Sequence, residues 1–321
     1  MSETAHTPAE WTDHAALWTA WPSHPELWGD TLAAARTAVA AMCTALAGAG
    51  DRVHVLATPG TPCPIEGVTV HEIEFGDIWL RDTGPIFARE GEQLIAARFG
   101  WNGWGGKYVL NHDDVVGDAI ADLAGAPVRR HDWILEGGAI ETNGEGACLT
   151  TRQCLLNDNR NARTDEATVA AQLRDALGIQ RVLWLDEGLR NDHTDGHVDN
   201  IARFVAPGVV MCMESADASD PNRDTLEAVA RDLSGFGLEV IRIPSPGAIT
   251  DARGELMAAS YLNFVIGNGA VVVPVYAAAA DDRAVAAIDD AFPGRTAMGI
   301  DARDLLTGGG AFHCITREQP A

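Results

Sequence analysis

The chain has 321 residues, 46% hydrophobic and 21% charged, and its 23 basic residues face 46 acidic ones, for a formal net charge of −23. This excess of acid argues against binding nucleic acid or an anionic membrane surface, and it favours a cationic small substrate. No run approaches eighteen uninterrupted apolar residues, so we predict no membrane span. The first ten residues show no secretory signal, and the six cysteines form no CxxC pair, so we expect a cytoplasmic protein with free thiols.

In chain order, the apolar pattern predicts helices that alternate with strands. After an aromatic opening over 11–28, interpreted as packing, we predict helices over 31–48, 117–123, 165–177, 224–233 and 282–292. Strands are expected over 52–57, 68–73, 128–135, 182–185 and 239–243, and hairpins over 197–213 and 262–275. A unit of this kind recurs roughly every 60 residues, which is typical of a propeller-like array. Because no stretch resembles a linker, we predict a single domain over 1–321.

A glycine-rich run near the end of the chain precedes a cysteine. Gly308, Gly309 and Gly310 allow the backbone to pass close to a ligand just before Cys314. A thiol in that position can lie in a pocket wall and act as a nucleophile. A buried structural cysteine beside a tight turn is the alternative.

Residues 192–200 read DHTDGHVDN and combine histidines with carboxylates. If 195–199 is extended, Asp195, His197 and Asp199 share one face of the strand. Flanking carboxylates would orient His197 and favour its charged form, which suits a general acid that later serves as a base. A solvated acidic loop is one alternative, and a metal site built from His193, Asp195 and His197 is another.

Three more segments place polar groups beside apolar ones. In 77–85 (DIWLRDTGP), Asp82 can grip a guanidinium through paired hydrogen bonds, and Trp79 offers a face that attracts cations. Glu136 ends an apolar stretch before two glycines, and Asn263 interrupts an apolar strand. The alternative for 77–85 is a charged turn after a strand. Glu136 could instead be a charge at an exposed strand end, and Asn263 could be a core residue.

These segments together resemble agmatine deiminases, within the wider group that includes the Porphyromonas-type peptidyl-arginine deiminases. The matching text is RDTGP at 81–85, EGG at 136–138, DGHVDN at 195–200, NFVIGNGAVVVP at 263–274 and GGGAFHCIT at 308–316. The resemblance implies the pentein fold, an α/β-propeller of five ββαβ units in a pseudo-fivefold arrangement around a central active-site channel. It also implies chemistry without a metal or another cofactor.

Residue roles follow from the same resemblance. The catalytic set is Cys314 as nucleophile, His197 as general acid and base, Asp82 and Asp199 as guanidinium clamps, and Glu136 beside the histidine. We expect substrate contacts from Trp79, Asp195, Asn263, Gly309 and Gly310. The implied reaction converts agmatine and water to N-carbamoylputrescine and ammonia through a covalent thiouronium. A deiminase of free arginine, peptidyl-arginine or a related guanidine, a metal-dependent amidohydrolase and a silent guanidine-binding protein are the alternatives. A homodimer is a hypothesis about assembly.

Departures from the family pattern concern the substrate tail. Ala311-Phe312 precede His313-Cys314 where the family has Asn and Ile, and Phe75-Gly76 replace Ser-Asn. The stretch after EGG lacks the usual histidine, and Arg152 occupies a commonly acidic position. We therefore expect guanidine hydrolysis and leave open which guanidine enters.

Overall fold

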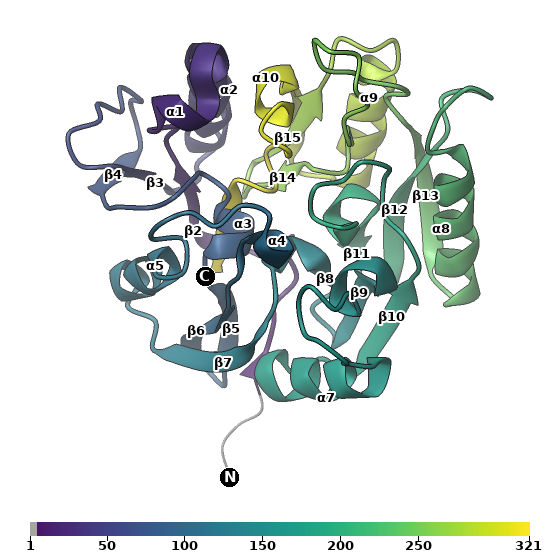
Figure 1. Ribbon diagram of the computed structural model, residues 1–321, viewed down its shortest axis with the longest axis horizontal. Coiled ribbons are helices and arrows are strands. Elements are labelled where there is room, and N and C mark those ends of the chain that lie inside the picture. Colours follow the sequence, from purple (N-terminus) through teal and green to yellow (C-terminus); the bar gives the residue numbers. More distant parts are fainter. Residues whose placement is uncertain (1–4) are drawn as a thin grey trace.

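Helices and strands alternate along residues 5–321, the part of the chain that the computed structural model describes (Figure 1). The strands are β1 Ala5–His6, β2 His14–Ala20, β3 Val53–Ala57, β4 Thr69–Glu72, β5 Ile86–Glu90, β6 Gln93–Gly100, β7 Val128–Ile134, β8 Ile140–Thr142, β9 Ala147–Thr151, β10 Arg181–Leu185, β11 Ala202–Ala206, β12 Val209–Glu214, β13 Glu239–Pro244, β14 Val265–Ile266, β15 Ala270–Val275, β16 Thr296–Asp301 and β17 Thr316–Pro320. The α-helices are α1 Pro25–Trp28, α2 Leu32–Gly48, α3 Leu80–Thr83, α4 Gly103–Gly106, α5 Val116–Ala124, α6 Arg152–Leu155, α7 Glu166–Leu177, α8 Arg223–Gly235, α9 Asp281–Ala291 and α10 Arg303–Leu306. Three short 3-10 helices are η1 Gly29–Thr31, η2 Gly137–Ala139 and η3 Val198–Asn200.

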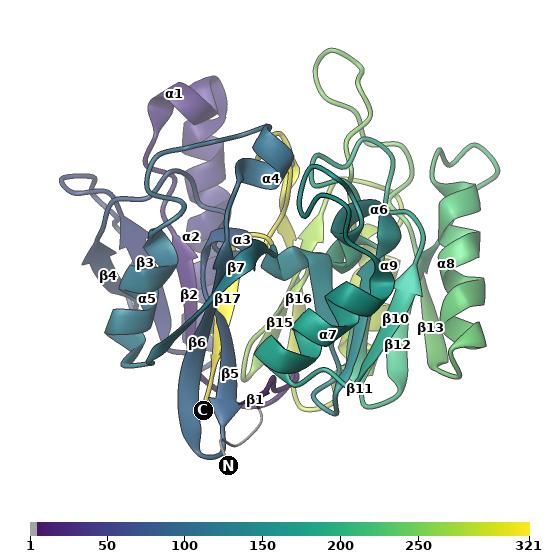
Figure 2. The same cartoon turned by 60° about the horizontal axis from the view of Figure 1, so that its bottom comes forward.

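The strands of this described part form five separate mixed sheets. Their orders are β17-β2-β3-β4, β1-β5-β6-β7, β10-β9-β8, β11-β12-β13 and β14-β15-β16. Each sheet has an antiparallel pair followed by a parallel partner, such as β11 with β12 and then β12 with β13. In each sheet a helix links one pair of parallel strands, as α8 does between β12 and β13, because a parallel connection needs a crossover (Figure 2). The further parallel pair β3–β4 is joined by a loop over 58–68.

The sheet that contains β2, the first long strand, also contains β17, the last strand. Strand β17 pairs antiparallel with β2, with Thr316 opposite Thr19 and Gln319 opposite Ala16. The backbone N–H of Ala321 also donates to the carbonyl of Asp13 at 2.9 Å. The loop that carries Cys314 is therefore fixed by the first long strand of the fold.

The predicted helices and strands are largely confirmed. Helix α7 begins after Asp165, whose side chain accepts from the N–H of Thr168, and ends before Gly178 in the left-handed conformation. Both predicted hairpins are present, as β11–β12 and β14–β15. The prediction that 195–199 is extended is wrong, because Asp195 has a φ of +62° in a turn and η3 begins at Val198.

One helical stretch, Pro25–Gly48, has the length and the apolar composition that would suffice to cross a membrane. Helix α2 within it is alanine-rich and buries Val39, Met42, Cys43 and Leu46. It packs against β15, β16 and α10. We assign it as a core helix, because its apolar side is covered by the protein's own sheet.

The connections between successive sheets carry the residues that the sequence singled out. Asp82 lies between β4 and β5, and Glu136 lies between β7 and β8. Asp199 precedes β11, Asn263 precedes β14 and Cys314 precedes β17. Each of the five residues therefore comes from a different passage of the chain from one sheet to the next.

Candidate active site

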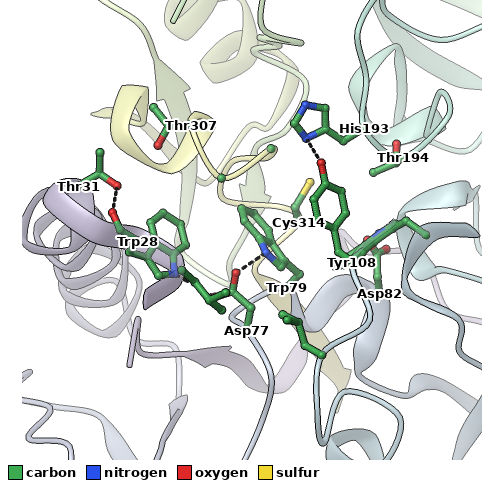
Figure 3. A pocket seen from close by; sticks show the side chains of 15 residues that line it. Trp28, Thr31, Asp77, Trp79, Asp82, Tyr108, His193, Thr194, Thr307 and Cys314 are labelled. Atoms are coloured by element: carbon green, nitrogen blue, oxygen red, sulfur yellow. Dashed lines mark hydrogen bonds between the residues drawn. The ribbon is translucent and has the colours of Figure 1, made fainter. Parts of the chain in front are cut away.

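A cavity of about 280 Å³ opens onto the thiol of Cys314 (Figure 3). It is lined by Leu27, Trp28, Thr31, Asp77, Trp79, Asp82, Trp104, Tyr108, Leu110, His193, Thr194, Thr307, Gly308, Gly309 and Cys314. The glycines of the preceding loop are required at this wall. A Cβ at Gly310 would lie 3.0 Å from the Cys314 sulfur and 2.9 Å from the Trp79 ring, and Gly309 has a φ of +111°.

The Cys314 sulfur is held by an amide and faces a carboxylate. The Asn263 Nδ2 donates to Sγ at 3.1 Å, while Asn263 Oδ1 accepts from the Cys314 backbone N–H at 3.2 Å. Asp199 Oδ2 lies 3.7 Å from Sγ. Burial, followed by the charges of Asp199 and Asp82, raises the pKa of the thiol well above its usual value. The free enzyme therefore holds a protonated thiol at neutral pH.

His197 lies fully buried between two carboxylates. Its Nδ1 is 3.9 Å from Asp82 Oδ1, and its Nε2 is 3.8 Å from Glu136 Oε2. Burial lowers the pKa of the imidazole, but the charge of Asp82 and the contacts with Cys154 and Glu136 outweigh it and raise the pKa well above the ordinary value. The ring is thus an imidazolium that can donate a proton.

The carboxylates of Asp82 and Asp199 both lie close to Gly138, although they come from different connections between sheets. Asp82 accepts from the Gly138 N–H at 2.8 Å and from Trp104 Nε1 at 2.9 Å. A Cβ added to Gly138 would lie 2.6 Å from His197 Nδ1, 3.0 Å from Asp199 Oδ2 and 3.1 Å from Asp82 Oδ1. A glycine at this position is therefore what allows the three functional groups to converge.

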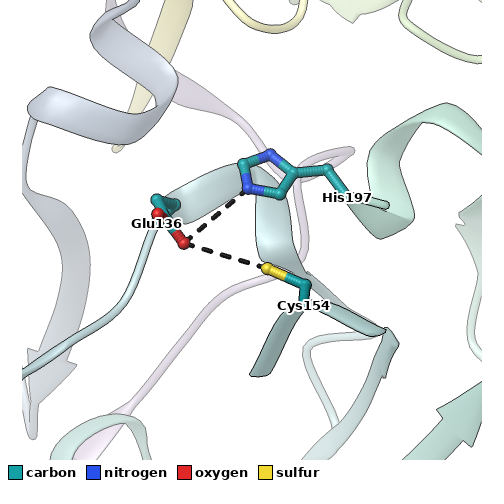
Figure 4. Close-up of side chains that lie close together, drawn as sticks. All are labelled: Glu136, Cys154 and His197. Carbon is teal, nitrogen blue, oxygen red and sulfur yellow. Dashed lines mark hydrogen bonds and ion pairs between the residues drawn. The ribbon is translucent and has the colours of Figure 1, made fainter. Parts of the chain in front are cut away.

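Glu136 anchors the far side of His197 (Figure 4). Its Oε1 accepts from Arg160 Nε at 2.7 Å, and its Oε2 faces the Cys154 thiol at 3.9 Å. Burial raises the pKa of Glu136, but His197 and Arg160 more than reverse this and lower it. Sequence reasoning missed the roles of Cys154 and Arg160, although their segments match family text (TTRQCLL at 150–156 and NRN at 159–161).

Two tryptophans form one side of the cavity. Trp28 Nε1 and Trp79 Nε1 donate to the two oxygens of Asp77 at 3.0 and 2.8 Å, and their rings stack with centroids 6.1 Å apart. The sequence predicts a packing role for the early tryptophans, and Trp28 is buried in the core, but it also lines the cavity. The shared carboxylate fixes both rings, and their faces can attract a cation.

The opposite side of the cavity is formed by Tyr108 and His193, with Tyr108 Oη 3.3 Å from His193 Nδ1 (Figure 3). Asp195 does not line the cavity, because its carboxylate bonds to Lys107 at 2.5 Å and to Arg160. The structure therefore separates the three ligands of the hypothetical metal site: His193 is at the mouth, Asp195 pairs with cations and His197 lies beside Glu136.

The sequence also did not predict a group of charged residues next to the site, formed by Glu10, Arg81, Arg203 and His313. Glu10 accepts from Arg81 at 2.8 Å and from Arg203 at 2.6 Å. The ring nitrogens of His313 lie 2.9 Å from Glu10 Oε1 and 2.8 Å from Asp199 Oδ2. Glu10 thus orients, through His313, the Asp199 carboxylate that faces the nucleophile.

Two of the sequence departures lie outside the cavity lining. Phe312 is fully buried in the core and does not line the cavity. Arg152 bonds to Glu166 and Asp186, both at 2.7 Å, and does not line it either. Gly76 donates its N–H to Asp113, and a Cβ at this position would lie 2.6 Å from the Cβ of Leu110, which lines the cavity. The glycine therefore allows the segment that carries Leu110 to approach.

The sequence profile of the Porphyromonas-type peptidyl-arginine deiminase family matches residues 6–320. The chain belongs to this family. The agmatine deiminase of Stutzerimonas stutzeri (strain A1501) is 35% identical over 353 aligned residues, which cover 98% of this chain and 95% of that protein. Membership accounts for the shared text around Asp82, Glu136, Asp199 and Cys314.

Solved structures of the same family superpose on the whole chain. An agmatine deiminase of C. jejuni, determined as a Cys-to-Ser variant with substrate bound, has a TM-score of 0.94 at 27% identity, and the match covers 99% of this chain and 97% of that one. The agmatine deiminase of Enterococcus faecalis gives a TM-score of 0.92 at 27% identity, covering 100% and 98%. The α/β fold of mixed sheets is therefore the fold of the family.

Proposed function

We propose that the protein hydrolyses the guanidinium group of agmatine to give N-carbamoylputrescine and ammonia. The observation that carries the proposal is the convergence of His197, Asp82 and Asp199 at Gly138, beside the Cys314 thiol at the base of an acidic, aromatic-walled cavity. A planar cation suits two carboxylates and a tryptophan face. Relatives named agmatine deiminase, matched over almost their full length, support this substrate.

The first half-reaction forms a covalent bond to sulfur. The bound guanidinium compensates the charges of Asp82 and Asp199, which otherwise raise the pKa of Cys314, so the thiol gives its proton to solvent. The thiolate attacks the guanidinium carbon, and the imidazolium of His197 gives its proton to the departing nitrogen. One C–S bond forms, one C–N bond breaks, ammonia leaves and a thiouronium remains on Cys314.

The second half-reaction restores the enzyme. His197, now neutral, takes a proton from water, and the resulting hydroxide attacks the same carbon. The C–S bond breaks, the proton of the added hydroxyl passes to the released thiolate, and the ureido product leaves with the new oxygen. Glu136 and Asp82, on opposite sides of the ring, stabilise the imidazolium each time it forms. Asn263 donates to the thiolate when it is released.

We further propose that the five sheets form one pseudo-fivefold propeller in a single domain, with the cavity in its central channel. The common order of an antiparallel pair, a crossover helix and a parallel strand supports this arrangement. The pairing of β17 with β2, which closes the chain on itself, supports a single domain. We retain as proposals a cytoplasmic location, a homodimer, and the absence of nucleic-acid or membrane partners.

A colour assay for ureido products tests the proposed function. The purified protein is supplied with agmatine, free arginine and a peptidyl-arginine, and Cys314→Ala serves as the matched inactive variant. We expect product from agmatine with the intact protein and none with the variant. Full activity of Cys314→Ala would overturn the nucleophile, and activity only on arginine or peptidyl-arginine would overturn the substrate.

A further inference from the structure

We propose that Glu136, Cys154 and His197 form an inhibitory zinc-binding site at the buried base of the active site (Figure 4). One ligand atom from each residue lies within 4.8 Å of the other two. A thiolate, an imidazole and a carboxylate are the three ligand types that proteins use for Zn²⁺. Binding of zinc rests on this geometry alone, whereas inhibition rests on the proposed function.

The spacing of the three atoms suits a tetrahedral ion. With Zn–S near 2.3 Å and Zn–N or Zn–O near 2.0–2.2 Å, tetrahedral ligands lie roughly 3.3–3.6 Å apart. Glu136 Oε2 is 3.9 Å from Cys154 Sγ and 3.8 Å from His197 Nε2. Closing these two gaps requires side-chain shifts of a few tenths of an ångström, and the Cys154 sulfur and the His197 ring nitrogen lie within 4.8 Å of each other. The fourth position is left for water or another ligand.

In the part of the chain that the structure describes, the ligand atoms of His197 and Glu136 at this site are not held by other hydrogen-bond partners. Neither ring nitrogen of His197 has a hydrogen-bond partner within residues 5–321, although the ring is fully buried. Arg160 engages only Oε1 of Glu136 through its Nε, and its terminal nitrogens bond to Asp195 and to the carbonyl of Thr194. Oε2 of Glu136 therefore stays turned toward the thiol and the imidazole.

In a second group of possible ligands, the oxygen atoms are already held by arginines. Glu10, Glu141 and His313 also place three ligand atoms within 4.8 Å of one another. Their oxygens already bond to the guanidinium groups of Arg81 and Arg203, and the group has no sulfur. A zinc ion there would have to displace two buried cations, so within the described residues the site at Glu136 is favoured.

The position explains why zinc would inhibit. The three residues are fully buried, whereas Asp82, which is 3.9 Å from the His197 ring, lines the cavity. An ion reaches the site through that cavity and binds Nε2 of His197 in place of a proton. The ring is then no longer an imidazolium, and the proton on Nδ1, the nitrogen that faces Asp82, is given up less readily. A bound guanidinium blocks the same path, and substrate therefore protects the enzyme from zinc.

The binding test uses Cys314→Ala, which removes the other thiol of the site. Zinc affinity is measured by competition with a chromophoric chelator. We expect one tight site in Cys314→Ala, and an affinity lower by at least about 10–100-fold when Cys154→Ser is added. Cys212→Ser, at a buried thiol on β12 remote from the cavity, is the matched control and should leave the affinity unchanged.

The activity test measures inhibition of the intact enzyme by Zn²⁺, with each variant compared to its own zinc-free rate. We expect inhibition that a chelator reverses, that agmatine slows, and that needs at least about 10-fold more zinc in Cys154→Ser. Equal zinc binding with and without Cys154 overturns the proposal, as does loss of the site in Cys314→Ala. Glu136→Gln provides the binding test if the serine variant does not fold, and the binding result stands even if no guanidine is hydrolysed.

Discussion

The side chain of Asn263 contacts Cys314 twice, donating to its sulfur at 3.1 Å and accepting its backbone N–H at 3.2 Å. The first contact lowers the pKa of the thiol and opposes the effect of burial and of Asp199. The second fixes the backbone from which the thiol projects. Asn263 thus acts on the nucleophile, and it does not line the cavity.

Asn263→Ala should raise the pKa of Cys314 further and lower kcat/KM by roughly 10–100-fold, the value of one hydrogen bond to a charged group. The check is the pH dependence of Cys314 alkylation by iodoacetamide, whose midpoint should move to higher pH. An unchanged midpoint would show that the amide does not stabilise the thiolate.

Asp82→Asn should abolish turnover yet make the thiol more reactive. The charge of Asp82 raises the pKa of Cys314, so its removal lowers that pKa and increases the thiolate fraction at pH 8. We expect alkylation of Cys314 to be about 3- to 10-fold faster than in the unmodified enzyme. Slower alkylation would contradict the assigned sign of the interaction.

Gly138→Ala should reduce activity by at least about 100-fold, because its Cβ would meet His197 Nδ1 at 2.6 Å and displace the groups that position the substrate. Gly48→Ala is the matched control: its Cβ meets nothing within 4 Å, at the end of helix α2. It should keep full activity. Steady-state kinetics and circular dichroism on both variants separate loss of the site from loss of the fold.

Asp77→Asn should weaken substrate binding more than chemistry. An amide offers one acceptor oxygen to the two indole N–H groups of Trp28 and Trp79, so one ring loses its anchor. We expect KM for agmatine to rise about 3- to 10-fold, within the range of a cation–π contact, with kcat changed less than about twofold. The exposed Asp30→Asn serves as control. A fall in kcat at constant KM would refute a binding role.

Glu10→Gln should destabilise the protein at pH 7 by about 2–4 kcal/mol, since Arg81 and Arg203 lose a buried partner and keep only their other acids. Burial alone raises the pKa of Glu10, but Arg81, His313 and Arg203 lower it well below the model-peptide value. Its stabilising effect is therefore complete above about pH 4.5 and is lost as pH falls through the lower native pKa. Urea unfolding at several pH values should show the variant and the parent converging only in acid.

The sequence was most informative where a functional residue sits in a distinctive local run. Cys314, His197 and Asp82 could be selected because glycines, carboxylates or a tryptophan surround them within a few positions. Cys154 and Trp28 could not be selected, because no local pattern marks them. Cys154 contacts Glu136, which is 18 positions away in the sequence, and Trp28 contacts Asp77, which is 49 positions away. The same is true of Glu10, whose partner His313 is 303 positions away.

Strands β2 and β17 were not predicted from the sequence, for a related reason. Strand β2 is buried on both faces along almost its whole length, so HAALWTA lacks the alternation that identifies a half-exposed strand. Strand β17 is the polar segment TREQP, which becomes a strand only by pairing with β2. The helices were easier to predict, because their capping residues and apolar periodicity are local.

The pairing of β17 with β2 places Pro320 opposite His14, so the last strand lies beside the first long strand. The site draws one residue from each passage between sheets, so it depends on how the passages meet and not on where the polypeptide starts. A circularly permuted chain, joined between its present ends and reopened at the exposed turn over 217–219, would keep all five connections intact. The site therefore requires that the five connections meet in space, but it does not require that they follow one another in the present chain order.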